Sequence, residues 1–137
     1  MKKLVFSGLL AGLVMLVVGL LANQAFGLIF TGLKAEYENP NLFRSWSDPL
    51  MSLYFLHPFL VGLILAWLWS KTKSLFRAGK CCSPGVNFGL MYWLITLPGM
   101  LISYASFPVS LLMILEWTLG GLFQAMVAGL ILERMDK

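Results

Sequence analysis

The sequence predicts an all-α integral membrane bundle of four transmembrane helices. Hydrophobic residues make up 59% of the chain and charged residues only 12%, with a mean hydropathy of +0.83. Apolar stretches of about 20 residues, the length that crosses the hydrocarbon core of a bilayer, run over about 4–30, 50–69, 86–104 and 109–132. Basic residues gather between alternate stretches. Residues 1–137 are therefore expected to form a single membrane domain.

The first stretch follows Lys2 and Lys3, as the apolar core of a cleaved signal peptide would. It is longer than the roughly 7–15 apolar residues of a signal peptide. It also carries Gly8, Gly12 and Gly19, a stripe of the kind that lets helices pack closely. We therefore expect a retained helix.

The connection over 34–48 carries aromatic and charged residues together with the turn pair Asn39-Pro40, which is typical of an extracytoplasmic loop at the level of the lipid head groups. It ends in Asp48-Pro49, which resembles a helix N-cap followed by a first-turn proline. The stretch that follows contains Pro58, which removes a helical hydrogen bond and predicts a kink.

The loop over 70–85 is basic and ends near Cys81 and Cys82. A neighbouring cation favours thiolate, and adjacent thiols could pass on a soft metal ion. No second cysteine pair and no metal-ligand spacing accompanies them, so the sequence predicts neither a zinc site nor a redox centre. Incidental cysteines at the membrane interface are the favoured interpretation.

The third stretch contains Pro98, a second predicted kink. After a short connection, Ser106 and Pro108 give a helix-start signal. The fourth stretch carries two stripes at a spacing of four residues. One is polar and consists of Glu116, Gly120 and Gln124. The other consists of small residues, which permit close helix packing: Gly121, Ala125 and Gly129.

The distribution of basic residues predicts orientation. If the four stretches alternate, both termini and the loop over 70–85 share one side, and Lys34 and Arg44 are the basic residues of the other. By the positive-inside rule the termini are cytoplasmic, and the inner (plasma) membrane of a prokaryote is the expected location. The net charge of +4 then points to anionic lipid head groups as partners, and not to nucleic acid.

The second and fourth stretches resemble each other at an offset of 59 residues. Besides several leucines, Ser47, Pro49, Gly62 and Ala66 coincide with Ser106, Pro108, Gly121 and Ala125, and His57 coincides with Glu116. This match favours two duplicated helical hairpins of the same orientation, a 2+2 parallel repeat. The shared apolar composition of the two stretches is the alternative explanation.

Glu116 is the one acidic residue inside the four stretches, and a carboxylate there needs a partner. His57, the one histidine, is expected at the same depth on a parallel helix, so the sequence predicts a direct or water-bridged Glu116–His57 pair. Asn23, Gln124 and Tyr54 are expected to complete a polar layer in the outer half of the bundle.

No catalytic, phosphate-binding or haem motif occurs, so an enzyme and a bound cofactor are not expected. Two classes of function remain. The first is a structural, accessory or assembly role in a homo-oligomer or a larger membrane complex. The alternative is a small solute, ion or proton-coupled transporter that uses Glu116 and His57.

Overall fold

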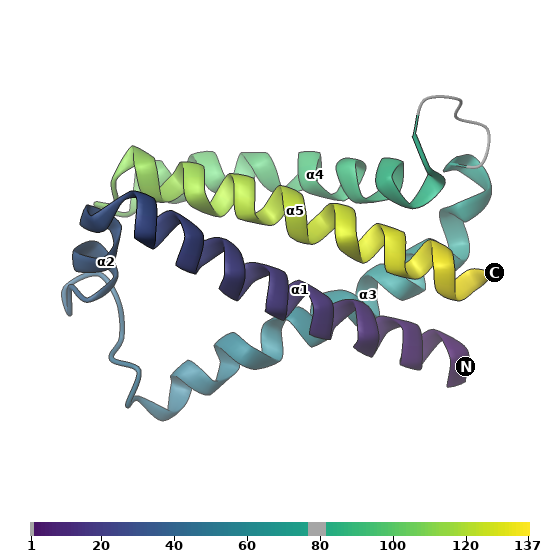
Figure 1. The fold of residues 1–137 in the computed structure, drawn as a ribbon, viewed down its shortest axis with the longest axis horizontal. Coiled ribbons are helices and arrows are strands. Elements are labelled where there is room, and N and C mark those ends of the chain that lie inside the picture. The colour runs from purple at the N-terminus through teal and green to yellow at the C-terminus, as the bar shows by residue number, and fades with distance from the viewer. Residues whose placement is uncertain (1, 77–81) are drawn as a thin grey trace.

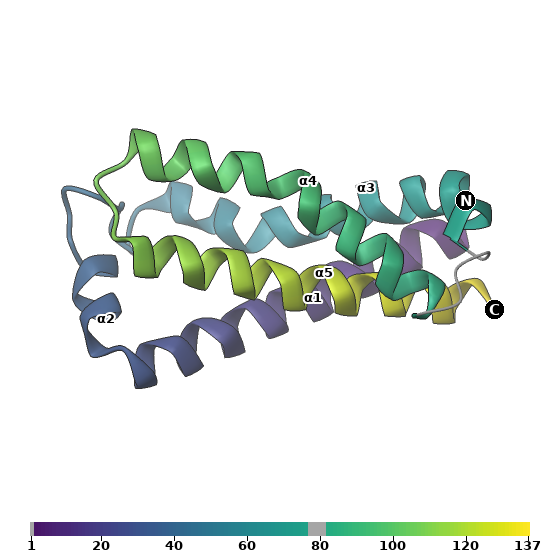
Figure 2. The ribbon, with the colours of Figure 1, turned by 90° about the horizontal axis from the view of Figure 1, so that it is seen from above.

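The computed structural model describes residues 2–76 and 82–137 as a bundle of helices (Figures 1 and 2). The elements in chain order are α1 (Lys2–Ile29), α2 (Thr31–Tyr37), the 3-10 helix η1 (Pro49–Met51), α3 (Ser52–Phe76), α4 (Pro84–Ser106) and α5 (Leu111–Asp136). Four helices, with η1 and α3 taken as one, are long and apolar enough to cross a membrane. The predicted all-α bundle with four membrane-spanning helices is confirmed.

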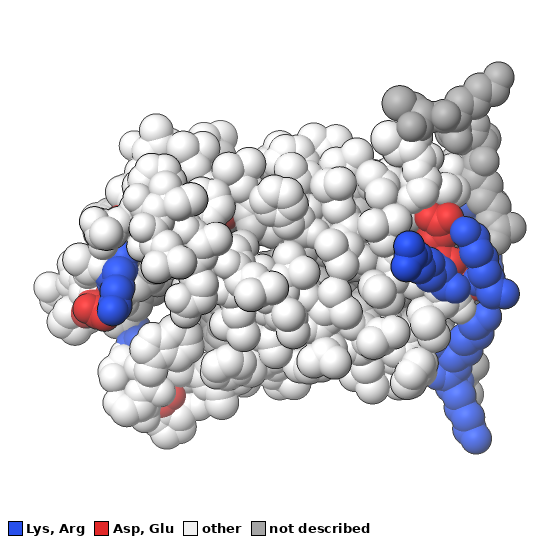
Figure 3. All heavy atoms as spheres, in the orientation of Figure 1, with Lys and Arg blue, Asp and Glu red and all other residues white. Residues whose placement is uncertain are grey.

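Both termini lie at the same end of the bundle (Figure 1). Lysine and arginine side chains gather at that end, and an almost uncharged band separates them from the charges at the opposite end (Figure 3). We refer to the end with the termini as the basic end, and to the end that carries α2 as the loop end. That the basic end is cytoplasmic stays a prediction.

Small residues lie at the contacts of the two most extensively packed helix pairs, α1 with α3 and α4 with α5. A side chain added at Gly62 of α3 would collide with the backbone of Gly8 and Gly12 of α1. A side chain added at Gly129 of α5 would likewise collide with the backbone of Gly85 in α4. These backbones approach so closely because no Cβ separates them.

The crossing of α1 and α3 near Gly12 has a consequence for the loop end. Because the two helices cross at an angle, α3 diverges from α1 toward the loop end (Figure 1). Every residue from Ser52 to His57 is exposed, and burial begins at Pro58. The loop-end half of α3 therefore packs little against the rest of the chain.

Two buried apolar clusters stabilise the bundle at different depths. The larger lies toward the basic end, and the smaller, at the loop end, joins Leu33 of α2 to the first residues of α5. The members of the larger cluster are Ala11, Met15, Leu65, Ala66, Trp69, Phe88, Ala128 and Leu132. The smaller consists of Leu33, Val109, Met113 and Ile114. The loop segment thus contributes to the core of the bundle.

Helix starts agree with the sequence at one position and differ at another. Asp48 caps η1 by accepting from the Leu50 amide at 2.9 Å. That bond, followed by the Arg44 side chain, lowers the pKa of the Asp48 carboxyl, so the cap is lost only as the pH falls through this lowered value. The predicted helix start at Ser106 is wrong. Ser106 ends α4, and Ser110 caps α5 instead.

The second correction concerns the loop over 34–48, whose beginning belongs to α2.

The proposed duplication is not tested by these helix bounds and stays a prediction. Pro49 opens η1, whereas its counterpart Pro108 lies between α4 and α5. The packing is also unequal, because α1 lies along α5 much more extensively than α4 lies along α3.

Candidate functional site

Glu116 is a buried acidic side chain, with 4% of its surface exposed, in the loop-end part of α5. The polar stripe to which it belongs faces α1. A side chain added at Gly120 would contact Ala22 of α1. A side chain added at Gly19 of α1 would collide with the side-chain amide of Gln124. The four-residue spacing of the stripe therefore brings Glu116 against the last turns of α1.

Both oxygens of the Glu116 carboxylate accept hydrogen bonds from other elements. Asn23 of α1 donates its amide Nδ2 to Oε1 at 2.8 Å, and Tyr37 of α2 donates its hydroxyl to Oε2 at 3.1 Å. An unpaired charge at the middle of a spanning helix costs about 2.5–3.5 kcal/mol on insertion scales. A hydrogen bond to a charged group contributes about 1.5–3 kcal/mol. Two such bonds are enough to offset the burial of this carboxylate.

Tyr37 connects Glu116 to a second, half-buried side chain. Its hydroxyl oxygen accepts a hydrogen bond from Nε1 of Trp117 at 2.6 Å while the hydroxyl proton points to Glu116. Burial raises the pKa of Tyr37 well above its usual range, and the nearby Glu116 adds to this effect although the Trp117 bond opposes it. The phenol therefore remains a hydrogen-bond donor at all physiological pH values.

A second set of hydrogen bonds fastens α2 to the start of α5. The Glu36 carboxylate accepts from the backbone amide of Ser110 at 2.5 Å and from the Ser110 hydroxyl at 2.7 Å. A carboxylate is favourable at this position because the first turn of a helix presents unpaired amides and a positive dipole end. Leu33, 1% exposed, anchors the same helix in the loop-end cluster.

We name this group of five side chains the loop-end lock. It consists of Asn23, Glu36, Tyr37, Glu116 and Trp117, with Ser110 as the partner of Glu36. It connects α1, α2 and α5, and the smaller apolar cluster lies beside it.

A direct Glu116–His57 hydrogen bond does not occur among the described residues, and the water-bridged form of the predicted pair stays a prediction. Asn23 and Tyr37 are the partners of Glu116, and His57 is exposed on the part of α3 that diverges from the bundle. Tyr54, expected in the same layer, packs edge-on against Trp46 of the loop, with ring centroids 5.6 Å apart. The physical reason is the crossing near Gly12, which leads this half of α3 away from α5.

The other predicted residues lie in several places. Of the small stripe on α5, Ala125 and Gly129 meet Gly89 and Gly85 of α4, whereas Gly121 is in ordinary contact with Trp93. On α1, Gly8 and Gly12 meet α3, whereas Gly19 faces α5. The small stripes therefore pack helices within the chain.

Pro58 and Pro98 lie inside continuous helices, α3 and α4. Cys81 lies outside the described residues, and Cys82 is exposed. Within residues 2–76 and 82–137, no group of three or more histidine, cysteine, aspartate or glutamate side chains is arranged to hold a metal ion.

Sequence reasoning missed Tyr37 and Glu36, because both fall in the segment expected to be a loop at the membrane surface. The pair Leu33 and Tyr37, four residues apart, is a weak signal of a helical turn with one apolar side. Asn23, by contrast, was expected near Glu116, and it donates to it.

The chemistry of the lock is that of a saturated hydrogen-bond network. Each oxygen of Glu116 has a donor, the Tyr37 hydroxyl has both a donor and an acceptor, and the carboxylate is closed off from solvent. Such a network holds elements together more readily than it binds a ligand.

No family model, curated protein or solved structure matches this chain.

Proposed function

We propose that this protein is a non-catalytic structural subunit of a membrane assembly, formed with further copies of itself or with other membrane proteins. The observation that carries the proposal is a contrast between two ionisable side chains of the loop-end half. Glu116 is saturated by its own chain. His57 is exposed, and no residue within 2–76 and 82–137 forms a hydrogen bond with it.

The depth of His57 makes this contrast informative. The span Pro49–Phe76 has 28 residues, which gives a length of roughly 42 Å at 1.5 Å per residue. A hydrocarbon core about 30 Å thick leaves roughly 6 Å of the helix outside at each end. His57 lies roughly 12 Å along the helix from Pro49, which would place it about 6 Å inside the hydrocarbon if the helix stood upright and centred in the bilayer. Ionisable side chains at such depths normally face protein or water, which favours a partner chain on this side of α3.

The loop-end half of α4 offers further surface of the same kind. From Leu101 to Pro108 every residue except Ser103 is exposed. Lipid would cover apolar side chains at little cost, so these residues alone do not call for a partner. Together with His57, the exposed residues among 101–108 form a surface on which helices from another chain could pack. The loop-end lock would hold the neighbouring loop in one conformation.

The transport alternative has less support. A proton or solute pathway through Glu116 needs water at the carboxylate, yet Glu116 is 4% exposed and saturated. Its predicted second group, His57, is exposed and forms no direct hydrogen bond with Glu116.

The test is the size of the complex that a tagged chain brings out of its native membranes in a mild detergent. We expect a complex larger than the monomer. His57 would form a hydrogen bond with a polar group of the partner. His57→Leu removes this bond and should therefore lower the yield of the complex several-fold, which is the effect expected for one hydrogen bond between helices in a membrane. Peptide analysis of the complex then distinguishes further copies of this chain from a different protein.

Leu60→Ala is the matched control, since Leu60 is exposed on the same helix one turn further in and carries no polar group. It should leave the yield near that of wild type. A monomer as the largest species, or equal losses for both variants, would contradict the proposal. So would pH-dependent ion flux in reconstituted wild-type protein that Glu116→Gln abolishes.

A further inference from the structure

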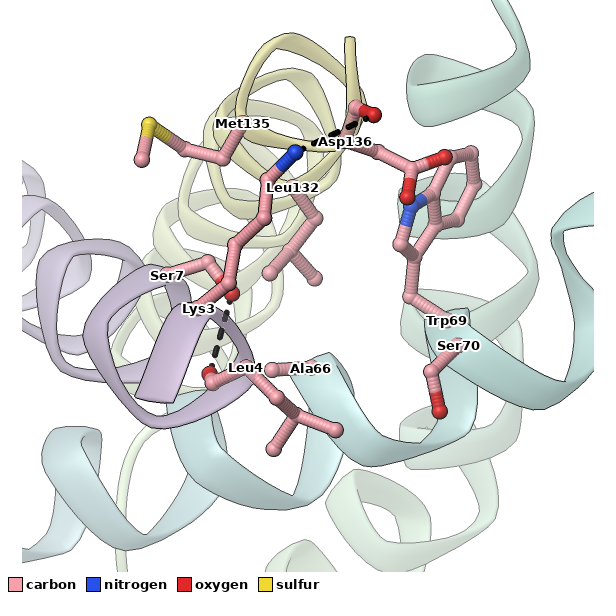
Figure 4. Close-up of a pocket in the computed structure, with 9 residues that line it drawn as sticks. All are labelled: Lys3, Leu4, Ser7, Ala66, Trp69, Ser70, Leu132, Met135 and Asp136. Atoms are coloured by element: carbon pink, nitrogen blue, oxygen red, sulfur yellow. Dashed lines mark hydrogen bonds between the residues drawn. The ribbon is translucent and has the colours of Figure 1, made fainter. Parts of the chain in front are cut away.

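A second polar site lies at the basic end, far along the bundle from the loop-end lock. A cavity of about 220 Å³ opens there between α1, α3 and α5. Figure 4 shows its lining, which consists of Lys3, Leu4, Ser7, Ala66, Trp69, Ser70, Leu132, Met135 and Asp136. At about 30 Å³ per water molecule, the cavity is large enough for roughly seven waters or a group of comparable size.

Trp69 presents an unused hydrogen-bond donor to this cavity. The side chain is 4% exposed, and its indole Nε1 is a buried polar atom without a hydrogen-bond partner in the described chain. Phe76 and Phe88 hold the ring, with centroids 6.4 Å and 5.3 Å from that of Trp69. Figure 4 shows the nitrogen on the side of the ring that faces the cavity. Since a buried indole N–H normally finds an acceptor, one is expected to come from outside the chain.

The charges around the cavity favour a negatively charged acceptor. The carboxylate of Asp136 is paired with the ammonium of Lys73, at 2.7 Å and 3.0 Å. Within residues 2–76 and 82–137, Lys3 donates to the backbone carbonyl of Asp136, at the long distance of 3.4 Å. Among the described residues Lys3 forms no salt bridge, and it lines the same cavity as Trp69.

The hydroxyl groups of the lining do not fill this need. Ser7 donates to the carbonyl of Leu4 at 2.9 Å, and Ser70 donates to the carbonyl of Trp67 at 2.6 Å. Both hydroxyls are thus used within their own helices. The donors directed at the cavity are those of Trp69 and Lys3.

We propose that this cavity binds the phosphate group of an anionic membrane phospholipid. A phosphate carries acceptor oxygens for the indole N–H and negative charge for Lys3. The cavity lies at the end of the spanning helices where lysine and arginine gather (Figure 3), which is the level of the lipid head groups. It is a specific site, beyond the general attraction of a basic surface for an anionic leaflet.

The test is a titration of the purified protein with phosphatidylglycerol in a mild detergent, followed by native mass spectrometry. Trp69→Phe keeps the aromatic ring but removes the donor, and should weaken phosphatidylglycerol binding about tenfold, as the loss of one hydrogen bond to a charged group does. Trp67→Phe is the matched control. Trp67 is 54% exposed on the same helix and lies outside the cavity, so its variant should bind as wild type does.

Lys3→Gln gives a second, independent variant should Trp69→Phe fail to fold, and it should also weaken binding. Unchanged affinity in both Trp69→Phe and Lys3→Gln would overturn the proposal, and water would then be the partner of the indole. Equal losses in Trp69→Phe and Trp67→Phe would overturn it too. Soluble glycerol phosphate that binds as tightly as the lipid would exclude a membrane lipid as the source of the phosphate.

Discussion

At the scale of single residues, the Tyr37 hydroxyl is the group on which the loop-end lock depends most. It connects Glu116 to Trp117, one hydrogen bond on each side. Glu116 has a second donor in Asn23, and α2 has a second attachment through Glu36. The hydroxyl of Tyr37, however, serves the buried Glu116 and the half-buried Trp117 at once.

Tyr37→Phe should therefore destabilise the protein. The change removes no packing, but it leaves one oxygen of the buried Glu116 and the indole nitrogen of the half-buried Trp117 without their partner. An unsatisfied buried group costs about 1–3 kcal/mol. We expect a lower thermal unfolding midpoint in detergent. Tyr104→Phe is the control, because Tyr104 is 46% exposed on α4 and the same loss of a hydroxyl there should change little. Equal midpoints for the two variants would contradict the role of Tyr37.

Sequence reasoning identified part of this site and failed on the rest for a physical reason. Glu116 is conspicuous because a carboxylate in an apolar helix needs a partner, and Asn23 was expected at its depth. The choice of His57 rested on equal depth along parallel helices. Depth does not determine lateral distance, which depends on where the helices cross.

At the scale of elements, glycine contacts determine how the helices pair. Gly62 against Gly8 and Gly12 joins α3 to α1, and Gly129 against Gly85 joins α5 to α4. Hydrophobic length predicted the four spans well, because a bilayer requires it. It could not predict α2. A seven-residue helix leaves little periodicity to detect, and this one is stabilised by contacts with distant segments.

Gly129→Ala should be strongly destabilising because the new Cβ would collide with the backbone of α4, and overpacking of this kind costs about 1–3 kcal/mol or more. Gly99→Ala is the matched control within the same helix pair. No atom lies within 4 Å of an added Cβ at Gly99, so this change should be neutral or stabilise α4 by about 0.5–1 kcal/mol through helix propensity. The thermal midpoints of the two variants check this. A Gly129→Ala midpoint at or above that of Gly99→Ala would contradict the close packing.

At the scale of the whole molecule, the two ends of the bundle are held by different means. The loop-end lock and its apolar cluster bind α2 to α1 and α5. At the basic end, Glu133 accepts from the Gly85 amide at the start of α4, and Lys73 pairs with Asp136. Residues 52–57 of α3 and residues 101–108, except Ser103, are exposed at the loop end. This arrangement suits a subunit that presents a fixed loop and free helix surface to a partner, which is the function proposed above.

The central claim is that Glu116 acts as a hydrogen-bonding element and not as a titrating group. Glutamine at this position keeps an acceptor for Asn23 and can donate to the Tyr37 oxygen, although it has no ionisable proton. Alanine removes both bonds. A structural role therefore predicts that Glu116→Gln keeps α2 in place and that Glu116→Ala does not, whereas a proton-handling role predicts the loss of pH-dependent ion flux in both variants.

Amide hydrogen exchange of α2, Thr31–Tyr37, measures this difference most directly. In Glu116→Gln we expect α2 to be protected nearly as well as in wild type. In Glu116→Ala its amides should exchange at least about tenfold faster, since the lost hydrogen bonds would have held α2 in place. Exchange in Glu116→Gln as fast as in Glu116→Ala, or an α2 that is already unprotected in wild type, would contradict the account.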